Sequence, residues 1–301
     1  MNGVMQAAGP AAQVIANIGW LLFGGGMVIF VGVMLLLAWA VRGRAKGLKA
    51  KAWILGGGVV LPSLVLGALF AYALPLSPAW RPVPPPGALV VSVTAHMWWW
   101  EVRYAGVDGT GEVVTANEIH IPTGRPVYLA LASGDVIHSF WVPALAGKMD
   151  MVPGRMQHLL LSAARPGIYR GQCAEFCGEQ HARMALHVVA QEPAAFDAWL
   201  QAQARPAVSR SLRGEQAFLQ QRCNACHAVR GATGDARLAP DLTHVGSRLH
   251  IAAGTLPNSS ASLAHWIAHV QEVKAGARMA SYPQIDPDTL AAMALWLESL
   301  K

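Results

Sequence analysis

The sequence predicts a multidomain membrane protein with three parts: a transmembrane helix hairpin, an all-β domain and an all-α domain. Two long apolar stretches without a charged residue, at 14–41 and 52–76, predict the hairpin. Short strand-like runs separated by Gly, Pro and Asp predict the β domain that follows. Helical patterns around the second of two cysteine motifs predict the α domain. A chain of 301 residues is long enough for these parts.

Residues 1–76 form the N-terminal segment and the predicted hairpin. Each apolar stretch exceeds the roughly 20 residues that cross the hydrocarbon core of a bilayer. The mean hydropathy of +0.34 also favours membrane segments. The glycines at 56–58 and Pro62 would weaken a soluble helix but are tolerated in a membrane helix. A signal peptide is the alternative interpretation of the first stretch, although no basic segment precedes its apolar run.

The basic residues are unevenly distributed along the chain. Five of the 23 Lys and Arg residues lie before residue 81, where there is no Asp or Glu: Arg42, Arg44, Lys46, Lys49 and Lys51. The remaining 18 are nearly balanced by 17 acidic residues, so the net charge of +6 does not indicate nucleic-acid binding. Because cytoplasmic loops are rich in Lys and Arg, this cluster predicts a cytoplasmic turn. Both termini then lie in the periplasm, if the chain belongs to the inner (plasma) membrane of a bacterium.

The β domain is predicted at 88–203, after a proline-rich spacer at 77–87. The spacing of its strands, about 8 to 12 residues, is typical of a sandwich or barrel. We expect strands at 89–93, 98–104, 118–121, 127–132, 136–142, 157–162 and 185–189. A short amphipathic helix at 193–203 closes the domain, with Phe196, Trp199 and Leu200 on one face.

The α domain is predicted at 212–301, after a linker at 204–211. We expect its helices at 213–222, 262–270 and 288–300. As a free tether, a linker of about ten residues would hold the two domains at an effective concentration of order mM.

All four cysteines belong to two motifs, and the second motif indicates a haem. Cys223-Asn-Ala-Cys226-His227 has the C-x-x-C-H spacing by which c-type haem is covalently attached. Cys223 and Cys226 would form the thioether bonds, and His227 would be the proximal axial ligand of the iron. A redox-active disulfide is the alternative, but the adjacent His and the absence of a βαβ pattern disfavour it.

The other axial ligand of this haem is expected to be Met279, on a loop after His227. Met293 falls within a predicted helix, where it is expected to pack in the core. Four histidines are further candidates, each more typical of a surface or hydrogen-bonded residue: His244, His250, His265 and His269. Ligation by Met and His raises the reduction potential of a haem, which suits an electron-transfer protein.

The first motif indicates copper. Cys173, Cys177, His181 and Met184 bring two thiolates, an imidazole and a thioether into one short stretch, and soft ligands of this kind suit copper. A disulfide would leave the His and the Met unexplained, and Met is a poor ligand for zinc. Two thiolates could bridge a copper pair, and each metal would then need its own imidazole. His138 in the β domain is the best candidate for the second one.

Three segments resemble the periplasmic domain of cytochrome c oxidase subunit II, and the similarity extends over the whole chain. They are Asp135-Val-Ile-His138-Ser-Phe, Lys148-Met-Asp150-Met-Val-Pro-Gly-Arg155 and the stretch from Cys173 to Met184. The resemblance implies a Greek-key cupredoxin fold that holds a mixed-valence dinuclear copper centre, CuA. The ligands that it implies are His138, Cys173, Cys177, His181, Met184 and the backbone carbonyl of Glu175. It also implies that the Glu175 side chain points toward a magnesium site shared with subunit I.

Trp98 resembles the tryptophan through which electrons reach CuA in this family, and packing within a half-buried strand is its alternative role. The chain departs from the family at Met97, where Gln is usual, and at Trp99, where Tyr is usual. Many subunit II sequences also carry a Glu at the mouth of a proton channel, at the start of the second membrane helix. The segment 49–53 has no Glu, which puts a proton-channel role in doubt.

The C-terminal part resembles class I cytochromes c, in which the terminal helices cross. Gly214 and Phe218 stand on the first predicted helix, Leu295 and Trp296 on the last, and the segment 240–242 resembles the one that supports the proximal His. The complete resemblance is to subunit II of a caa-type haem–copper oxidase, with haem c, CuA and possible Mg as cofactors.

Such a subunit takes electrons from cytochrome c or another respiratory donor and passes them through haem c and CuA to subunit I, where oxygen is reduced to water. The resemblance implies subunits I and III and membrane lipid as partners, and no catalytic residue in this chain. Two alternatives remain open at this point. One is the CuA subunit of a nitric oxide reductase, and the other is a membrane-anchored electron carrier without an oxidase.

Overall fold

The computed structural model of the chain describes residues 6–43, 49–76, 83–105 and 111–301. These residues divide into two compact units, one of residues 13–81 and one of residues 1–12 together with 82–301. Part of the basic cluster, at 44–48, and the first part of the proline-rich spacer, at 77–82, lie outside the described residues.

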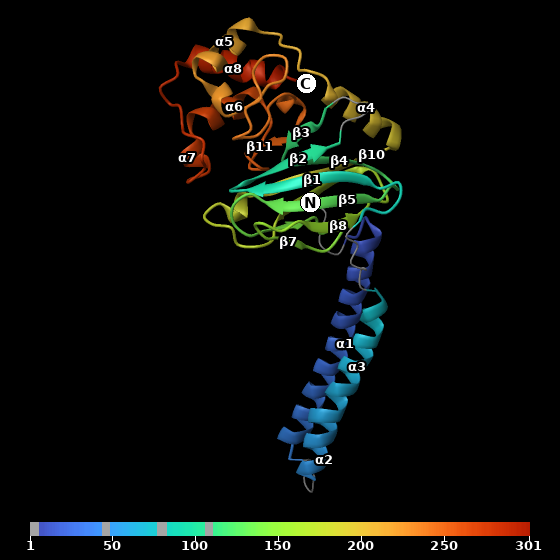
Figure 1. The fold of residues 1–301 in the computed structure, drawn as a ribbon. Coiled ribbons are helices and arrows are strands. Elements are labelled where there is room, and N and C mark those ends of the chain that lie inside the picture. Colours follow the sequence, from blue (N-terminus) through green and yellow to red (C-terminus); the bar gives the residue numbers. More distant parts are fainter. Residues whose placement is uncertain (1–5, 44–48, 77–82, 106–110) are drawn as a thin grey trace. The chain divides into compact units, whose positions relative to one another are not determined.

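The smaller unit consists of two long apolar helices (Figure 1). The first is α1 (Pro10–Val41). The second runs from Ala50 to Leu76 through α2 (Ala50–Leu55), a π-helical segment (Gly56–Val60), α3 (Leu61–Ala73) and a final 3₁₀ turn (Leu74–Leu76). The π-helical segment begins with the three glycines that the sequence places there. Both helices, of 32 and 27 residues, are long and apolar enough to cross a membrane, which fits a membrane-anchored chain.

The β domain is a sandwich of two five-stranded sheets (Figure 1). The first sheet has the strand order β3 (Val113–Ala116), β2 (Trp99–Tyr104), β1 (Leu89–His96), β5 (Val127–Ser133) and β8 (Gln157–Leu161). The second has the order β4 (Glu118–Pro122), β10 (Ala185–Gln191), β9 (Gly167–Cys173), β6 (His138–Trp141) and β7 (Met149–Met151). Alternate residues of β1 and β2 are buried, as expected for a sheet with one face on the core. Trp100, Tyr104, Phe140 and Leu129 are among the large side chains of this core.

Among its described residues, the β domain contains every strand expected from the sequence and three more, namely β3, β7 and β9. The strand β7 is only three residues long, which is too short for an alternating pattern to be recognised. The strand β9 contains two glycines, an Arg and a Gln, so its composition resembles that of a loop. The helix α4 (Pro193–Ala204) matches its prediction closely, with Phe196 and Leu200 buried against the sandwich.

The α domain contains α5 (Leu212–Gln220), α6 (Ser260–Ala268), α7 (Val270–Val273) and α8 (Pro287–Ser299), with a short hairpin of β11 (His250–Ile251) and β12 (Leu256–Pro257). The predicted contact between its first and last helices is confirmed. The rings of Phe218 on α5 and Trp296 on α8 lie 5.1 Å apart. Gly214 allows this approach, because a Cβ atom at this position would meet Trp296 and the carbonyl oxygen of Ala292.

Replacing Gly214 with alanine is therefore expected to destabilise the α domain by about 1–3 kcal/mol, because added volume forces apart two packed helices. Denaturant unfolding followed by haem absorbance would measure the change. Gly234→Ala is the matched control, since no atom lies within 4 Å of a Cβ atom built there. Equal stability of the two variants would contradict the prediction.

The segment 204–211 is bound to the α domain and is not a free tether. The amide N–H of Ala207 donates to the carbonyl oxygen of Arg230 at 2.9 Å. The indole N–H of Trp296 donates to the Ser209 hydroxyl at 2.9 Å, and the ring of His244 hydrogen-bonds the carbonyl oxygen of Arg205 at 2.9 Å. These contacts restrict the motion that a flexible linker would allow. The β and α domains fall within one compact unit, so the residue numbers of their boundary remain a prediction.

Candidate metal centres

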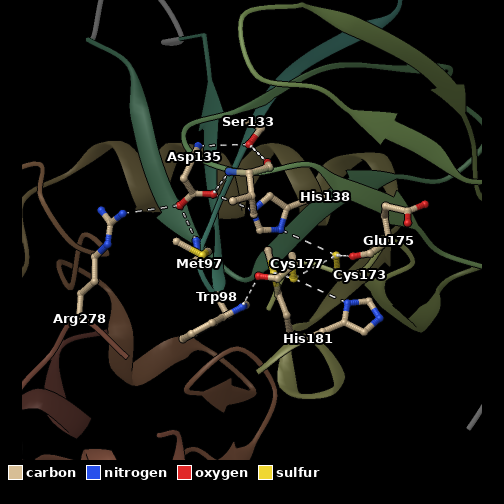
Figure 2. A network of polar contacts seen from close by, with 12 residues as sticks. Met97, Trp98, Ser133, Asp135, His138, Cys173, Glu175, Cys177, His181 and Arg278 are labelled. Atoms are coloured by element: carbon tan, nitrogen blue, oxygen red, sulfur yellow. Dashed lines mark hydrogen bonds and ion pairs between the residues drawn. The ribbon is translucent and has the colours of Figure 1, made fainter. Parts of the chain in front are cut away.

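The first cysteine motif folds as a loop at one end of two inner strands of the second sheet, β9 and β10. Cys173 ends β9, and Cys177, His181 and Met184 follow on the connection to β10. His138 begins β6, which pairs with β9 so that Phe140 lies opposite Cys173. This pairing brings a histidine far away in the sequence beside the cysteine loop (Figure 2).

Six potential metal-binding groups converge at this loop. The two cysteine sulfur atoms lie 3.8 Å apart, well beyond the ~2.05 Å of a disulfide bond, and both cysteines are free thiols. Cys173 Sγ lies 3.8 Å from His138 Nδ1 and 3.2 Å from the carbonyl oxygen of Glu175. Cys177 Sγ lies 3.6 Å from His181 Nδ1 and 3.9 Å from Met184 Sδ. The structure thus gathers all the groups that the sequence nominated, and their role as metal ligands remains a prediction.

The chemistry of these groups fits a copper pair. Cys173, Cys177, His138 and Met184 are all buried, so sulfur and imidazole donors face one another with little access for water. The hydrogen bond from the Cys177 thiol lowers the pKa of Cys173 and favours its thiolate, whereas the same contact raises the pKa of Cys177 in the metal-free pair. Thiolate, imidazole and thioether donors together are typical of copper sites.

The orientation of His138 is set by Asp135 (Figure 2). The His138 Nε2 atom lies 2.8 Å from Asp135 Oδ1, which leaves Nδ1 directed at the sulfur pair. The carboxylate also accepts the backbone N–H groups of Met97 at 2.7 Å and Val136 at 2.8 Å. Burial opposes its ionisation, but these hydrogen bonds outweigh burial and lower the pKa of Asp135. An ionised carboxylate behind a metal-binding His fixes its tautomer and orientation.

The Glu175 side chain points away from the sulfur pair. Its carboxylate is 45% exposed and lies 3.4 Å from the Lys148 ammonium, which also binds Asp150 at 3.0 Å. This contact with Lys148 does not test the magnesium role expected of Glu175, so that role remains a prediction.

His227 of the second motif lines a cavity, and Met279 lies in the same lining, as a haem bound by both residues would require. Apolar side chains such as Leu242 and Trp266 also line it. His227 Nδ1 lies 2.7 Å from the carbonyl oxygen of Pro240, to which it donates its proton, so Nε2 is the atom left for a metal. Burial lowers the pKa of His227, which keeps the imidazole neutral and able to bind iron.

The remaining candidates for the haem fall into different environments. Met293 is fully buried in the helical core, as predicted. His244 is hydrogen-bonded to the chain at 204–211, whereas His250 lines the cavity and stacks on a histidine of the β domain. The roles of Cys223, Cys226, His227 and Met279 as haem-binding residues remain predictions.

Comparison with known families assigns both domains. Residues 107–191 match the family described as cytochrome C oxidase subunit II, periplasmic domain, and residues 211–301 match cytochrome c. The chain joins a cytochrome c oxidase subunit II domain to a cytochrome c domain. The fold class predicted from the sequence is confirmed. The chain has two apolar N-terminal helices, a cupredoxin-like β domain and a helical cytochrome c domain.

Individual relatives agree with this assignment. The cytochrome c oxidase subunit 2 of Alkalihalophilus pseudofirmus is 38% identical over 215 residues, which are 70% of this chain and 61% of that protein. The protein of the same name from Bacillus sp. strain PS3 is 34% identical over 227 residues, 71% of this chain and 62% of that protein. The chain thus spans about three-fifths of these relatives. The crystal structure of the periplasmic domain of subunit II (CoxB) from Bradyrhizobium japonicum is 27% identical and covers 40% of this chain and 96% of that one, with a TM-score of 0.37.

Trp98 belongs to the subunit II domain and lies where that domain meets the cytochrome c domain. Its indole N–H donates to the carbonyl oxygen of Cys177 at 2.8 Å, and the side chain is only 9% exposed. Trp98 also lines the cavity beside His227 and Met279, together with Met97 and Trp99. Trp98, nominated from the sequence, therefore contacts the candidate copper-binding loop, residues 173–184, and borders the cavity that His227 and Met279 line.

Two functional candidates in the cytochrome c domain were missed by the sequence analysis. Arg278, next to Met279, approaches Asp135 to 4.0 Å and so reaches the residue that orients His138 (Figure 2). Lys274 is buried between the domains. Neither stands in a recognisable motif, and their roles depend on contacts between segments far apart in the sequence.

Two stacked histidines at this interface predict an acid-sensitive contact. The rings of His187 and His250, one from each domain, lie 4.4 Å apart. Burial, then the nearby charge of His250, lowers the pKa of His187 to about 4, with Arg170 acting in the same direction and Glu118 against it. In the unfolded chain, His187 is protonated below pH ~6.5. In the folded chain it is protonated only below about pH 4, so acid favours the unfolded chain between these values.

Stability is therefore expected to fall as the pH drops from about 6.5 to 4, by up to about 3 kcal/mol at ~1.36 kcal/mol per pKa unit. His187→Phe keeps a ring against His250 but cannot be protonated, so it should flatten this dependence. Thermal unfolding at a series of pH values would measure it, with the exposed His265→Phe as control. An unchanged pH profile in His187→Phe would refute the assignment.

Proposed function

We propose that this chain is the electron-accepting subunit of a terminal respiratory oxidase, a caa-type subunit II. Electrons from cytochrome c or another respiratory donor would pass through haem c and dinuclear CuA to subunit I, where oxygen is reduced to water. Because the chain spans only part of its relatives' length, their names support this activity and do not establish it.

The position of Trp98 carries the proposal. One side chain hydrogen-bonds the carbonyl of Cys177 in the copper-binding loop and lines the cavity that His227 and Met279 share. An aromatic side chain placed in this way supports electron transfer between two centres within the same chain. Trp98 itself lies in the turn between β1 and β2, outside both strands.

The residues of the two sites have distinct tasks in this proposal. Haem c and CuA supply reversible one-electron chemistry when they are bound. Cys173 and Cys177 would hold the copper pair as thiolates, and the other donors would be His138, His181, Met184 and the Glu175 carbonyl. Asp135 holds His138, and the anchoring of the loop between β9 and β10 limits the change of ligand geometry. Cys223 and Cys226 would attach the haem covalently, and His227 and Met279 would bind its iron.

The two apolar helices support anchoring in a bacterial plasma membrane, with both redox domains in the periplasm. Subunits I and III of the oxidase are the proposed partners. The exposed Glu175 carboxylate would contribute to a magnesium site at the boundary with subunit I.

Purification of the tagged full chain from its native membrane tests the function. We expect a large haem-bearing subunit to co-purify and the complex to consume oxygen with reduced cytochrome c as donor. Nitric oxide reduction without oxygen uptake would identify the reductase alternative instead. Recovery of the chain alone, with both redox centres but no catalytic partner, would favour a free electron carrier.

A further inference from the structure

Lys274 is a buried lysine whose ammonium group binds backbone carbonyls from both domains. Its side chain is 3% exposed. The Nζ atom donates to the carbonyl oxygens of Trp98 at 2.8 Å, Arg183 at 2.9 Å and Ala252 at 3.2 Å. Trp98 and Arg183 belong to the subunit II domain, whereas Ala252 belongs to the cytochrome c domain. The three acceptors match the three N–H groups of an ammonium ion.

The two acceptors in the subunit II domain lie at functionally important places. Trp98 is the proposed electron-transfer residue, and Arg183 directly precedes Met184 of the copper-binding loop. One ammonium group therefore ties both of these segments to the cytochrome c domain. Burial of an ammonium ion is unfavourable unless such partners compensate for the lost water. Burial nevertheless lowers the pKa of Lys274 to about 7, so the ammonium form with three N–H donors prevails below that pH.

The residues on either side of Lys274 make contacts of the same kind. The Gln180 side-chain amide donates to the carbonyl oxygen of Ala275 at 2.9 Å, and the Arg183 guanidinium donates to that of Val273. Gly276 packs against the indole of Trp98, where a Cβ atom would come within 3.3 Å of the ring. The segment 273–276 thus covers both the copper-binding loop and Trp98. It leads directly to Met279, the proposed haem ligand.

We propose that Lys274 is a positioning residue that locks the cytochrome c domain onto the copper-binding loop and holds Trp98 between the two redox sites. This inference rests on the proposed function, since it assigns Lys274 to electron transfer between haem c and CuA. Lys274 contacts neither centre and acts through Trp98 and the loop. Loss of its ammonium group leaves the carbonyls of Trp98 and Arg183 without this donor in a buried site.

Lys274→Met tests the inference in the full chain, because Met has a similar length but no N–H group. Lys301→Met is the matched control, since Lys301 is exposed. The first measurement is hydrogen exchange at two amides that bond across the domains: Leu249, which donates to Glu118 at 2.9 Å, and Ala185, which donates to Ala253 at 3.0 Å. We expect at least tenfold faster exchange at both amides in Lys274→Met and no change in Lys301→Met.

The second measurement is the rate of electron transfer from haem to copper after rapid photoreduction of the haem. We expect at least a tenfold decrease in Lys274→Met, with the absorption spectra of both centres unchanged. Wild-type exchange and a wild-type rate in this variant would overturn the inference. If the wild-type chain itself transferred no electrons between the centres, the proposed function would fail, and the exchange measurement would still decide whether Lys274 locks the domains.

Lys274→Gln provides a second variant if Lys274→Met does not fold. The Gln amide retains two N–H donors, so we expect exchange and transfer rates between those of the wild type and those predicted for complete loss of the donor. Rates equal to those of the wild type in a folded Lys274→Gln variant would also overturn the inference.

Discussion

Replacing Cys173 with serine is expected to abolish copper binding while the haem stays attached. The change removes one of the two sulfur atoms, which lie 3.8 Å apart and would bridge the metals. Loss of an outer hydrogen-bond partner alone lowers metal affinity by roughly 10–100-fold, so loss of a bridging thiolate should lower it by more than about 100-fold. Metal analysis and near-infrared absorbance would record the loss of copper, and the visible haem spectrum would report the second centre.

Cys226→Ser serves as the reciprocal variant, because it removes one thioether bond and leaves the copper-binding loop intact. It should retain the copper spectrum and bind its haem through one covalent link only. Retention of a full copper pair in Cys173→Ser would contradict the dinuclear assignment. So would a single mononuclear blue copper site in the wild-type protein.

Replacing Met279 with alanine is expected to lower the reduction potential of the haem. Met279 lines the same cavity as His227, and Met/His ligation raises haem potentials. Loss of the thioether should lower the potential on the order of 100 mV, a modest part of the ~0.8 V range that axial ligands control. Redox titration would measure the change, and binding of carbon monoxide to the ferrous haem would report the open coordination position.

Met293→Leu is the matched control for this prediction. Met293 is fully buried in the core, and replacing Met with Leu conserves its volume, so the potential should stay at its wild-type value. A lowered potential in Met293→Leu with a normal potential in Met279→Ala would transfer the axial role to Met293.

The parts of the fold carried by local patterns could be predicted from the sequence. Length and hydropathy predicted the two apolar helices, and apolar periodicity predicted α4, α5 and α8. The strands β7 and β9 could not be predicted, because one is very short and the other carries glycine and polar residues. Their hydrogen-bonding partners are distant in the sequence, and those partners decide whether such segments form strands.

The candidate sites also divide into residues indicated by local sequence patterns and residues placed by contacts between distant segments. The spacing of Cys173, Cys177, His181 and Met184 indicates a metal site directly, because all four stand on one loop. His138 reaches that loop only through the pairing of β6 with β9, and its place was inferred from the need for a second imidazole. Nothing in the sequence around Lys274 indicates burial, since its three acceptors come from three separate segments.

The cover that residues 274–276 provide over Trp98 has a consequence for any free protein that meets this face of the subunit II domain. A free redox protein could not contact the Trp98 indole there, because Gly276 already packs against it and Trp98 is buried. The fused cytochrome c domain therefore excludes other proteins from that face. A diffusing electron donor would have to approach from the side of the cytochrome c domain.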